Sequence, residues 1–178
     1  MKKIGEHAFC YRSVHDMVET IAIPNTVKSI DTGAFALGTP EDGMGDPSYH
    51  SSTLRQVEIS NSVTHINDYA FYYCVGLTSI IIPDSVIIIG ESAFDGCILL
   101  TSIDLGENVR TIGQSAFGPL GWYEPCTIQF KGTPNTIGEY AFYDDGSSGS
   151  IMYVPWSEGE VDNDPWGFGG EIVYNYTA

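Results

Sequence analysis

The stretch LTSIIIPDSVIIIGESAFDGC, residues 77–97, decides the fold because most of it returns elsewhere in the chain. Its phrase Ile89-Gly-Glu-Ser-Ala-Phe94 is one of six versions. The others read IGEHAF, IDTGAF, INDYAF, IGQSAF and IGEYAF, and they begin at Ile4, Ile30, Ile66, Ile112 and Ile137. The alanines of successive versions are 26, 36, 23, 23 and 25 residues apart. A phrase that returns every 20 to 50 residues predicts a solenoid of stacked repeats.

Two short extended runs precede the phrase in most repeats. The first run alternates, as in Leu77–Pro83 and Leu100–Gly106, and its fifth place varies between two apolar places. This period of two puts the varying residue on the solvent side of a strand. The second run, such as Val86–Ile89, is rich in β-branched residues and predicts a strand on the opposite wall of the coil.

The phrase itself predicts the corner that follows. Gly, Asp or Asn at its second or third place suits a tight turn. The alanine suits close approach between coils. The phenylalanines, placed in register, predict an aromatic stack inside the solenoid.

Composition limits the class of protein and its partners. A hydrophobic content of 43% is enough for a continuous core and too high for a disordered chain. The 7 basic and 23 acidic residues give a net charge of −16, which argues against nucleic acid and anionic membranes as partners. A strong negative charge also keeps a protein soluble, which is a simpler explanation for it. No apolar run reaches the 18 residues of a membrane span, and MKKIGEHAF, which opens in mid-repeat, lacks the apolar stretch of a secretion signal.

The pattern LxxIxLPxxVxxIGxxAFxxC at a 23-residue step, which residues 77–99 match nearly end to end, resembles the BspA-type leucine-rich repeat of bacterial surface proteins. Weaker copies extend the likeness over about residues 4–155. The resemblance implies a mainly β, right-handed and curved solenoid of about six coils. Its parallel sheet would line the concave side, and short strands and turns would replace long helices on the other side. Cys74 and Cys97 hold equivalent places, where this family usually carries free, buried thiols. A disulfide between them would need converging Cβ vectors.

Three stretches depart from the repeat. Each lies between a phenylalanine and the next alternating run, so we expect all three to project from one edge of the solenoid: Ala36–Thr53, Gly118–Pro125 and Tyr143–Gly149. Insertions on one edge are frequent binding sites, although a long loop is also tolerated without any role. Residues 1–155 are expected to form the solenoid, and residues 156–178 a cap of the same domain that covers the last coil with Trp156, Trp166 and Phe168.

No pattern of catalytic or metal-binding residues stands out. Ser115 in GQSAFG lacks the final glycine of a nucleophile elbow and is expected to be a turn residue. The histidines (His7, His15, His50 and His65) show no HExxH spacing. Carboxylates from Glu160 onward have calcium-loop spacing, but Pro165 occupies the place where the sharp turn needs glycine. We therefore expect no enzyme, no metal and no cofactor.

Candidate binding residues lie on the predicted sheet and on one edge loop. The outward row of the sheet offers Glu58, Ile81, Asp104, Gln129 and Tyr153, with Arg55 beside it. Trp122 and Tyr123 form a second candidate, because exposed aromatic residues often anchor partners. Plain surface remains the alternative for both groups.

By resemblance, the expected function is a non-enzymatic, adhesin-like binding module outside a bacterial cell that recognises proteins or glycans. A second interpretation remains open, in which the chain is a structural or host-recognition component of a phage virion or a larger assembly, with the repeats as scaffold. The sequence identifies neither the ligand nor the oligomeric state.

Overall fold

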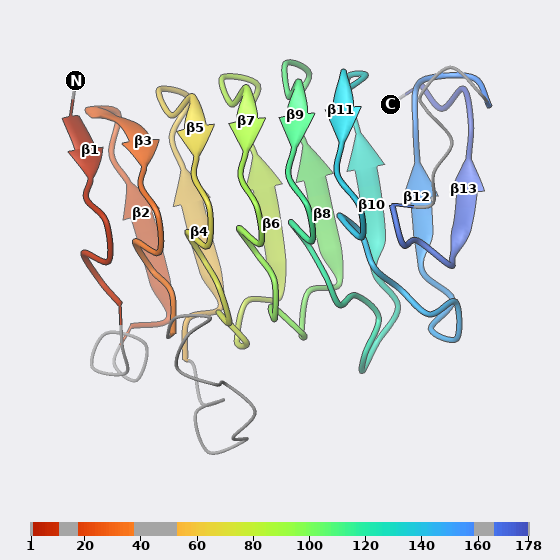
Figure 1. The fold of residues 1–178 in the computed structure, drawn as a ribbon, viewed down its shortest axis with the longest axis horizontal. Helices are drawn as coiled ribbons and strands as arrows, with labels where there is room; N and C mark the ends of the chain where they lie inside the picture. The colour runs from red at the N-terminus through yellow and green to blue at the C-terminus, as the bar shows by residue number, and fades with distance from the viewer. Residues whose placement is uncertain (1, 11–17, 38–52, 159–165, 178) are drawn as a thin grey trace.

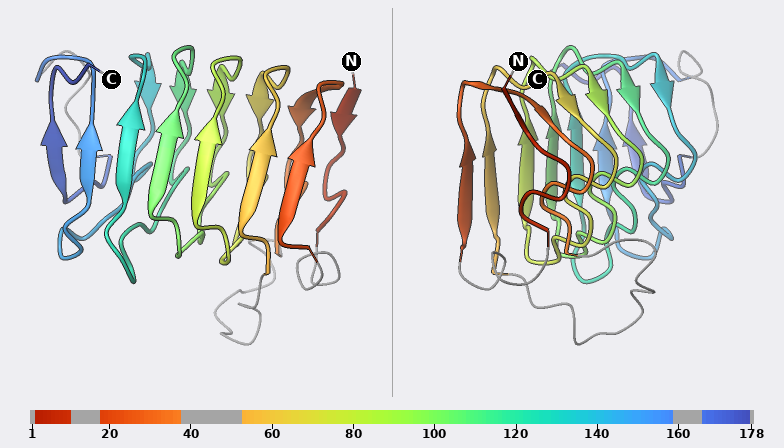
Figure 2. Two further views of the ribbon diagram at one scale, coloured as in Figure 1. Left: turned by 180° about the vertical axis from the view of Figure 1, so that it is seen from behind. Right: turned by 60° about the vertical axis from the view of Figure 1, so that its left-hand side comes forward.

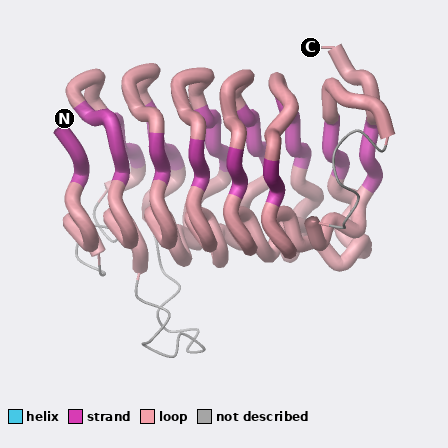
Figure 3. The backbone as a smooth tube through the Cα atoms, turned by 45° about the horizontal axis from the view of Figure 1, so that its top comes forward, coloured by secondary structure: helices cyan, strands magenta, loops and turns pink. Residues whose placement is uncertain are grey.

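The computed structural model describes residues 2–10, 18–37, 53–158 and 166–177 of the 178-residue chain. Over these residues the chain winds into a stack of coils whose strands lie side by side (Figure 1). Figure 3 shows strands and loops, with no helix in the same ranges. The mainly β solenoid is therefore confirmed. Most of the Ala36–Thr53 insertion, together with His15, His50 and the carboxylates from Glu160 to Asp164, lies outside the described residues.

The second run of each repeat builds a six-stranded parallel sheet in the order β1-β3-β5-β7-β9-β11. Within it the first residue of each phrase pairs with its equivalent in the next coil, as Ile66 does with Ile89 and Ile89 with Ile112. We call the outward side of this sheet the short-strand face. Its strands are β1 (Lys2–Ile4), β3 (Val27–Ile30), β5 (His65–Ile66), β7 (Ile88–Ile89), β9 (Thr111–Ile112) and β11 (Thr136–Ile137).

The first run of each repeat builds the opposite wall, which we call the long-strand face (Figure 2, left). Its strands are β2 (Thr20–Ile23), β4 (Gln56–Ile59), β6 (Ser79–Ile82), β8 (Ser102–Leu105), β10 (Thr127–Phe130), β12 (Ile151–Tyr153) and β13 (Glu171–Val173). Strand β6 shows the expected alternation, with Ile80 and Ile82 buried and Ser79 and Ile81 exposed. The strands end before Pro24 and Pro83, as expected of a residue without a backbone donor.

The long-strand face is not one continuous sheet. Strands β2 and β4 pair with each other, and β6, β8, β10, β12 and β13 form a separate parallel sheet. Where the coils join, the Thr78 amide lies 3.3 Å from the Arg55 carbonyl oxygen, whereas the Thr101 amide lies 2.9 Å from that of Thr78. The residues on both sides of the break follow the common pattern, so the sequence carries no sign of it.

The core between the two walls is built from equivalent residues in register. The phenylalanine stack (Phe9, Phe35, Phe71, Phe94, Phe117 and Phe142) runs through all six coils, with ring centroids 5.0–5.2 Å apart and interplanar angles of 2–9°. The alanine before each of the last five phenylalanines is fully buried. At the first five corners the phenylalanine amide donates to the alanine carbonyl of the next coil, as Phe94 does to Ala116 at 2.7 Å. The predicted aromatic stack is confirmed.

The glycines of the phrase have a different role from the expected one. The residue in the left-handed turn conformation is the fourth of the phrase, with φ between 50° and 60°: His7, Gly33, Tyr69, Ser92, Ser115 and Tyr140. The second-place glycine is instead needed for contact between coils. A Cβ atom at Gly113 would lie 2.5 Å from the Glu91 nitrogen and from the Gly90 carbonyl carbon. A Cβ atom at Gly5, in the first coil, would meet nothing within 4 Å.

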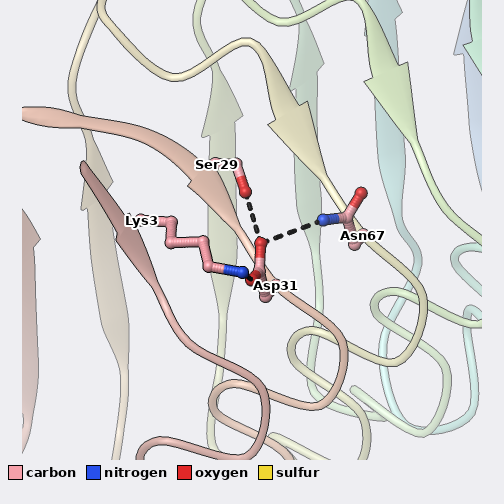
Figure 4. Close-up of polar contacts among 4 residues, drawn as sticks. All are labelled: Lys3, Ser29, Asp31 and Asn67. Atoms are coloured by element: carbon pink, nitrogen blue, oxygen red, sulfur yellow. Dashed lines mark hydrogen bonds and ion pairs between the residues drawn. The ribbon is translucent and has the colours of Figure 1, made fainter. Parts of the chain in front are cut away.

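Polar side chains join the coils where Asp31 and Asn67 stand at the glycine place. The Lys3 ammonium lies 2.6 Å from Asp31 Oδ2, while Ser29 Oγ and Asn67 Nδ2 donate to Asp31 Oδ1 at 2.5 and 3.3 Å (Figure 4). The hydrogen bond from Lys3 is the main reason why the pKa of Asp31 lies below its usual value. Hydrogen bonds thus connect three coils where close backbone packing is not possible.

The two ends of the stack differ. At the C-terminal end, the Phe142 amide donates to the Trp166 carbonyl, so Trp166 takes the place that an alanine holds in the other coils. Trp156 and Trp166 are 3% and 9% exposed, and β13 extends the sheet next to β12. At the N-terminal end, Phe9 is 42% exposed and forms part of an apolar pocket of about 380 Å³ with Ile4, Ile21 and other core residues. The boundary at residue 155 stays a prediction.

Candidate functional site

The long-strand face carries the predicted row of outward side chains. Ile81 and Asp104 are paired across neighbouring strands, as are Asp104 and Gln129, and then Gln129 and Tyr153. Ile81 is 61% exposed, so most of this apolar side chain is available to a partner. The register thus brings four of the predicted residues into one line. Whether they bind anything stays a prediction.

The break between β4 and β6 forms a groove beside Ile81. Its volume is about 280 Å³, and it is lined by Gln56, Val57, Glu58, Ile59, Ser79 and Ile81. Glu58 and Ile81 therefore belong to one concave feature. Arg55 does not line it, and its Nη1 lies 3.4 Å from the Gly76 carbonyl oxygen. The groove combines one apolar anchor with a carboxylate, an amide and a hydroxyl. Such a mixture suits a ligand with apolar and polar parts.

Tyr153 lies at the C-terminal end of the row and is partly covered. Its ring centroid is 4.9 Å from that of Tyr176, with the rings tilted by 52°. The two rings give this end of the long-strand face an aromatic surface that Tyr153 alone would not supply. The contribution of Tyr176 was not predicted, because it follows the last strand and belongs to no repeat.

The second candidate lies on the edge formed by the loops that precede β10 and β12, at the lower side of Figure 1. A pocket of about 330 Å³ is lined there by Pro119, Leu120, Gly121, Trp122, Tyr143, Asp145 and Ser147. Trp122 and Tyr143 are 67% and 44% exposed. Two loops that are separate in sequence therefore build one pocket, which we call the edge pocket.

The structure separates the two aromatic residues that were predicted together. Trp122 lines the edge pocket, whereas its exposed neighbour Tyr123 does not. Tyr143 takes the second aromatic place instead. The sequence did contain a signal for it, since Tyr143 opens one of the three stretches that depart from the repeat.

A cluster formed by Tyr69, Tyr72 and Tyr73 was not predicted from the sequence. The ring centroids of Tyr69 and Tyr72 are 5.5 Å apart, and those of Tyr72 and Tyr73 are 4.6 Å apart. Burial raises the pKa of the neighbouring Asp95 to about 6, although hydrogen bonds from Ser92 and Gly96 act in the opposite direction. Burial, followed by the charge of Asp95, also raises the pKa of Tyr73.

The cysteines and the serine that were considered for a disulfide or for catalysis have structural roles. The Cys74 and Cys97 thiols are buried and free, and they donate to the carbonyl oxygens of Phe35 and Phe71, both at 3.3 Å. Burial raises the pKa of both thiols, and raises that of Cys126 to about 12, so all three are poor nucleophiles. Ser115 is in the left-handed turn conformation, as its turn role predicts.

Metal-binding clusters and membrane spans are also missing from the ranges that the structure describes. Those ranges hold no group of three or more His, Cys, Asp or Glu side chains with a geometry suited to a metal ion. They also hold no helix with the length and apolar character needed to cross a lipid bilayer. The carboxylates of the possible calcium loop from Glu160 to Asp164 lie outside them, whereas Glu171 is the first residue of β13.

Comparison with known proteins agrees with the architecture. The chain resembles a leucine-rich repeat protein from Bacteroides ovatus ATCC 8483, whose crystal structure superposes with a TM-score of 0.53 at 25% sequence identity. The match covers 85% of this chain and 34% of the other, so this chain spans about a third of that protein. No curated protein matches the chain.

The family model of the BspA type leucine rich repeat region matches residues 1–39 and 43–154 in six copies. These ranges contain all six versions of the phrase and the strands of both walls up to β12. The register of the coils, the phenylalanine stack and this match agree with one another. The chain therefore belongs to the BspA-type leucine-rich repeat family.

Proposed function

We propose that this chain is a non-enzymatic, adhesin-like binding module, displayed outside a bacterial cell, that recognises proteins or glycans through its long-strand face and its edge loops. Its family membership supports a binding or scaffold role for the solenoid. The observation that carries the proposal furthest is the groove beside Ile81, where an exposed apolar side chain and Glu58 share one concave feature.

The physical argument rests on what the groove offers a partner. Complete burial of a fully exposed isoleucine contributes roughly 1.5–3 kcal/mol, and Ile81, at 61% exposed, keeps more than half of that surface for a ligand. The polar side chains around it give such a contact direction, since each must find a hydrogen-bond partner once water is displaced. Anchors of this kind, rather than total area, carry most of the affinity of protein interfaces.

The test is binding of the purified protein to an array of matrix proteins and glycans. Ile81→Ser removes the anchor from the groove, and Tyr153→Ser removes the far end of the row. Ile87→Ser is the matched control, because Ile87 is also exposed, at 41%, but directly precedes β7 on the opposite wall. We expect saturable binding that falls at least tenfold with Ile81→Ser and stays within twofold with Ile87→Ser.

Two results would count against the proposal. Equal loss with Ile81→Ser and Ile87→Ser would show that the groove is not the binding surface. No saturable binding to any array member by the folded protein would leave the repeats as scaffold, which is the role they would have in a virion or a larger assembly. A fourth variant, with Ala36–Thr53 shortened to the length of a regular repeat, tests the insertion separately.

A further inference from the structure

The edge pocket brings together two aromatic side chains and one carboxylate. Trp122 enters it from the loop before β10, and Tyr143, Asp145 and Ser147 come from the loop before β12. Both aromatic side chains keep a large part of their surface in solvent, and neither belongs to the core. A pocket with exposed aromatic walls is a place where a ligand can gain contact without any rearrangement of the core.

Contacts between the two loops fix the shape of the pocket. The Leu120 amide donates to the Tyr143 carbonyl at 2.7 Å. Gly121 packs so closely that a Cβ atom there would lie 2.4 Å from Ser148 Oγ. The buried Asp144 accepts from the Gly146 amide and from Ser148 Oγ, both at 2.7 Å. The pocket walls are therefore held before any ligand arrives, which lowers the entropy cost of binding.

Asp145 presents a charged oxygen to the pocket. Its Oδ1 accepts from the Ser147 amide at 2.9 Å and from Ser147 Oγ at 2.5 Å. These hydrogen bonds lower the pKa of Asp145, so its carboxylate is ionised at neutral pH. Both of these hydrogen bonds, which come from described residues, go to Oδ1 of Asp145. Its other oxygen, Oδ2, remains available to a donor on a ligand.

The segment that builds the pocket is mainly negative. Residues 118–149, which include both loops, contain four carboxylate side chains and a single basic residue, Lys131. Such a field attracts cations and repels anionic ligands. Aromatic faces attract cations as well, with tryptophan the strongest, and a guanidinium group stacks on them through its planar face.

From these observations we propose that the edge pocket binds the guanidinium or ammonium side chain of a basic segment in a partner protein. The cation lies against the faces of Trp122 and Tyr143 and donates to Asp145 Oδ2. This assignment rests on the proposal that the solenoid is a binding module, but it uses a different surface from the groove beside Ile81.

The test uses a short acetylated and amidated Gly-Arg-Gly peptide, with the same peptide carrying citrulline as the uncharged control. Binding is followed by the indole N–H signals in NMR spectra. Trp156 and Trp166 are buried, so Trp122 is the indole that a ligand at the surface reaches. We expect one indole signal to shift saturably with the arginine peptide, at least tenfold weaker binding of the citrulline peptide, and weaker binding at higher salt.

Three variants locate the site. Trp122→Ala should abolish saturable binding, which is then followed through backbone amide signals, and Asp145→Asn should weaken it at least fivefold while keeping an oxygen for the Ser147 contacts. Tyr123→Ala is the matched control, because Tyr123 is equally exposed but does not line the pocket, and it should change the affinity less than twofold. Thermal unfolding of each variant checks the fold.

Equal binding of the arginine and citrulline peptides would overturn the assignment. So would the absence of any saturable shift, or a saturable shift of the Trp122 signal by neutral oligosaccharides alone, which would make the pocket a glycan subsite. None of these results would affect array binding that depends on Ile81, so the two proposals fail separately.

Discussion

Individual residues of the repeat matter more for how one coil packs on the next than for the shape of their own coil. The second-place glycine of the phrase looks like a turn residue in the sequence, yet the turn is made two residues later, at a place occupied by His, Gly, Ser or Tyr. A left-handed conformation costs a residue other than glycine about 1–2 kcal/mol. Hydrogen bonds to the next coil offset that cost at every corner.

The first prediction concerns Gly113. Gly113→Ala should lower the free energy of unfolding by roughly 1–3 kcal/mol, because its Cβ atom would push against the backbone of the preceding coil. Urea denaturation at equilibrium measures the change. Gly5→Ala introduces the same side chain where nothing lies within 4 Å, and we expect a change below about 0.5 kcal/mol. Similar losses in both variants would contradict this role of Gly113.

The second prediction concerns Asp95, whose folded-state pKa of about 6 lies above the ordinary value of 3.8. Between these two values the folded state binds more protons than the unfolded state, so stability falls as the pH rises from about 4 to about 6. Asp95→Asn should remove this fall and raise the free energy of unfolding at pH 7 by on the order of 1–2 kcal/mol.

Denaturation curves at several pH values test the Asp95 prediction. Glu107→Gln, at an exposed position, is the control and should leave the pH dependence of the wild type in place. A wild-type protein with constant stability from pH 4 to pH 7 would show that Asp95 is not buried enough to matter.

Among the structural elements, the phenylalanine stack is the most regular, and its contribution should depend on position. Phe94→Ala removes a fully buried ring with a neighbour on each side, and should cost about 3–5 kcal/mol of unfolding free energy. Phe9→Ala, at the half-exposed end with one neighbour, should cost much less. Equal costs in urea denaturation would mean that the stack contributes little beyond local packing.

The repeat made most elements predictable from the sequence. The alternating run of residues 77–83 identifies β6 and its outward Ile81, and the recurring phenylalanines predict the stack. Three features lacked such a signal. The break between β4 and β6 depends on backbone spacing between coils, the pairing of Tyr153 with Tyr176 brings in a residue beyond the repeats, and the edge pocket depends on how two irregular loops pack. A repeat pattern predicts the contacts that every coil makes, whereas these three features depend on contacts that only one place in the stack makes.

For the molecule as a whole, the fourth prediction is a gradient of stability along the stack. Each coil contacts mainly its two neighbours, so an end coil loses half of the contacts that hold a central coil. The first coil also leaves Phe9 and an apolar pocket open to solvent. We expect amide hydrogen exchange to be fastest in β1, slower in β13, which pairs with β12, and slowest in β7 and β8. Uniform protection would indicate a single cooperative unit.

The pairing of strands between neighbouring coils, continuous along the short-strand face, also determines how the protein responds to force. A load that pulls the two ends apart acts on the outermost coil first, because each coil is bonded to its neighbours and not across the stack. The chain should then peel away one coil at a time, and a regular coil of 23 residues should release about 80 Å of extended chain. Such a molecule lengthens under tension in small steps, and the coils that remain keep their surface and their contacts.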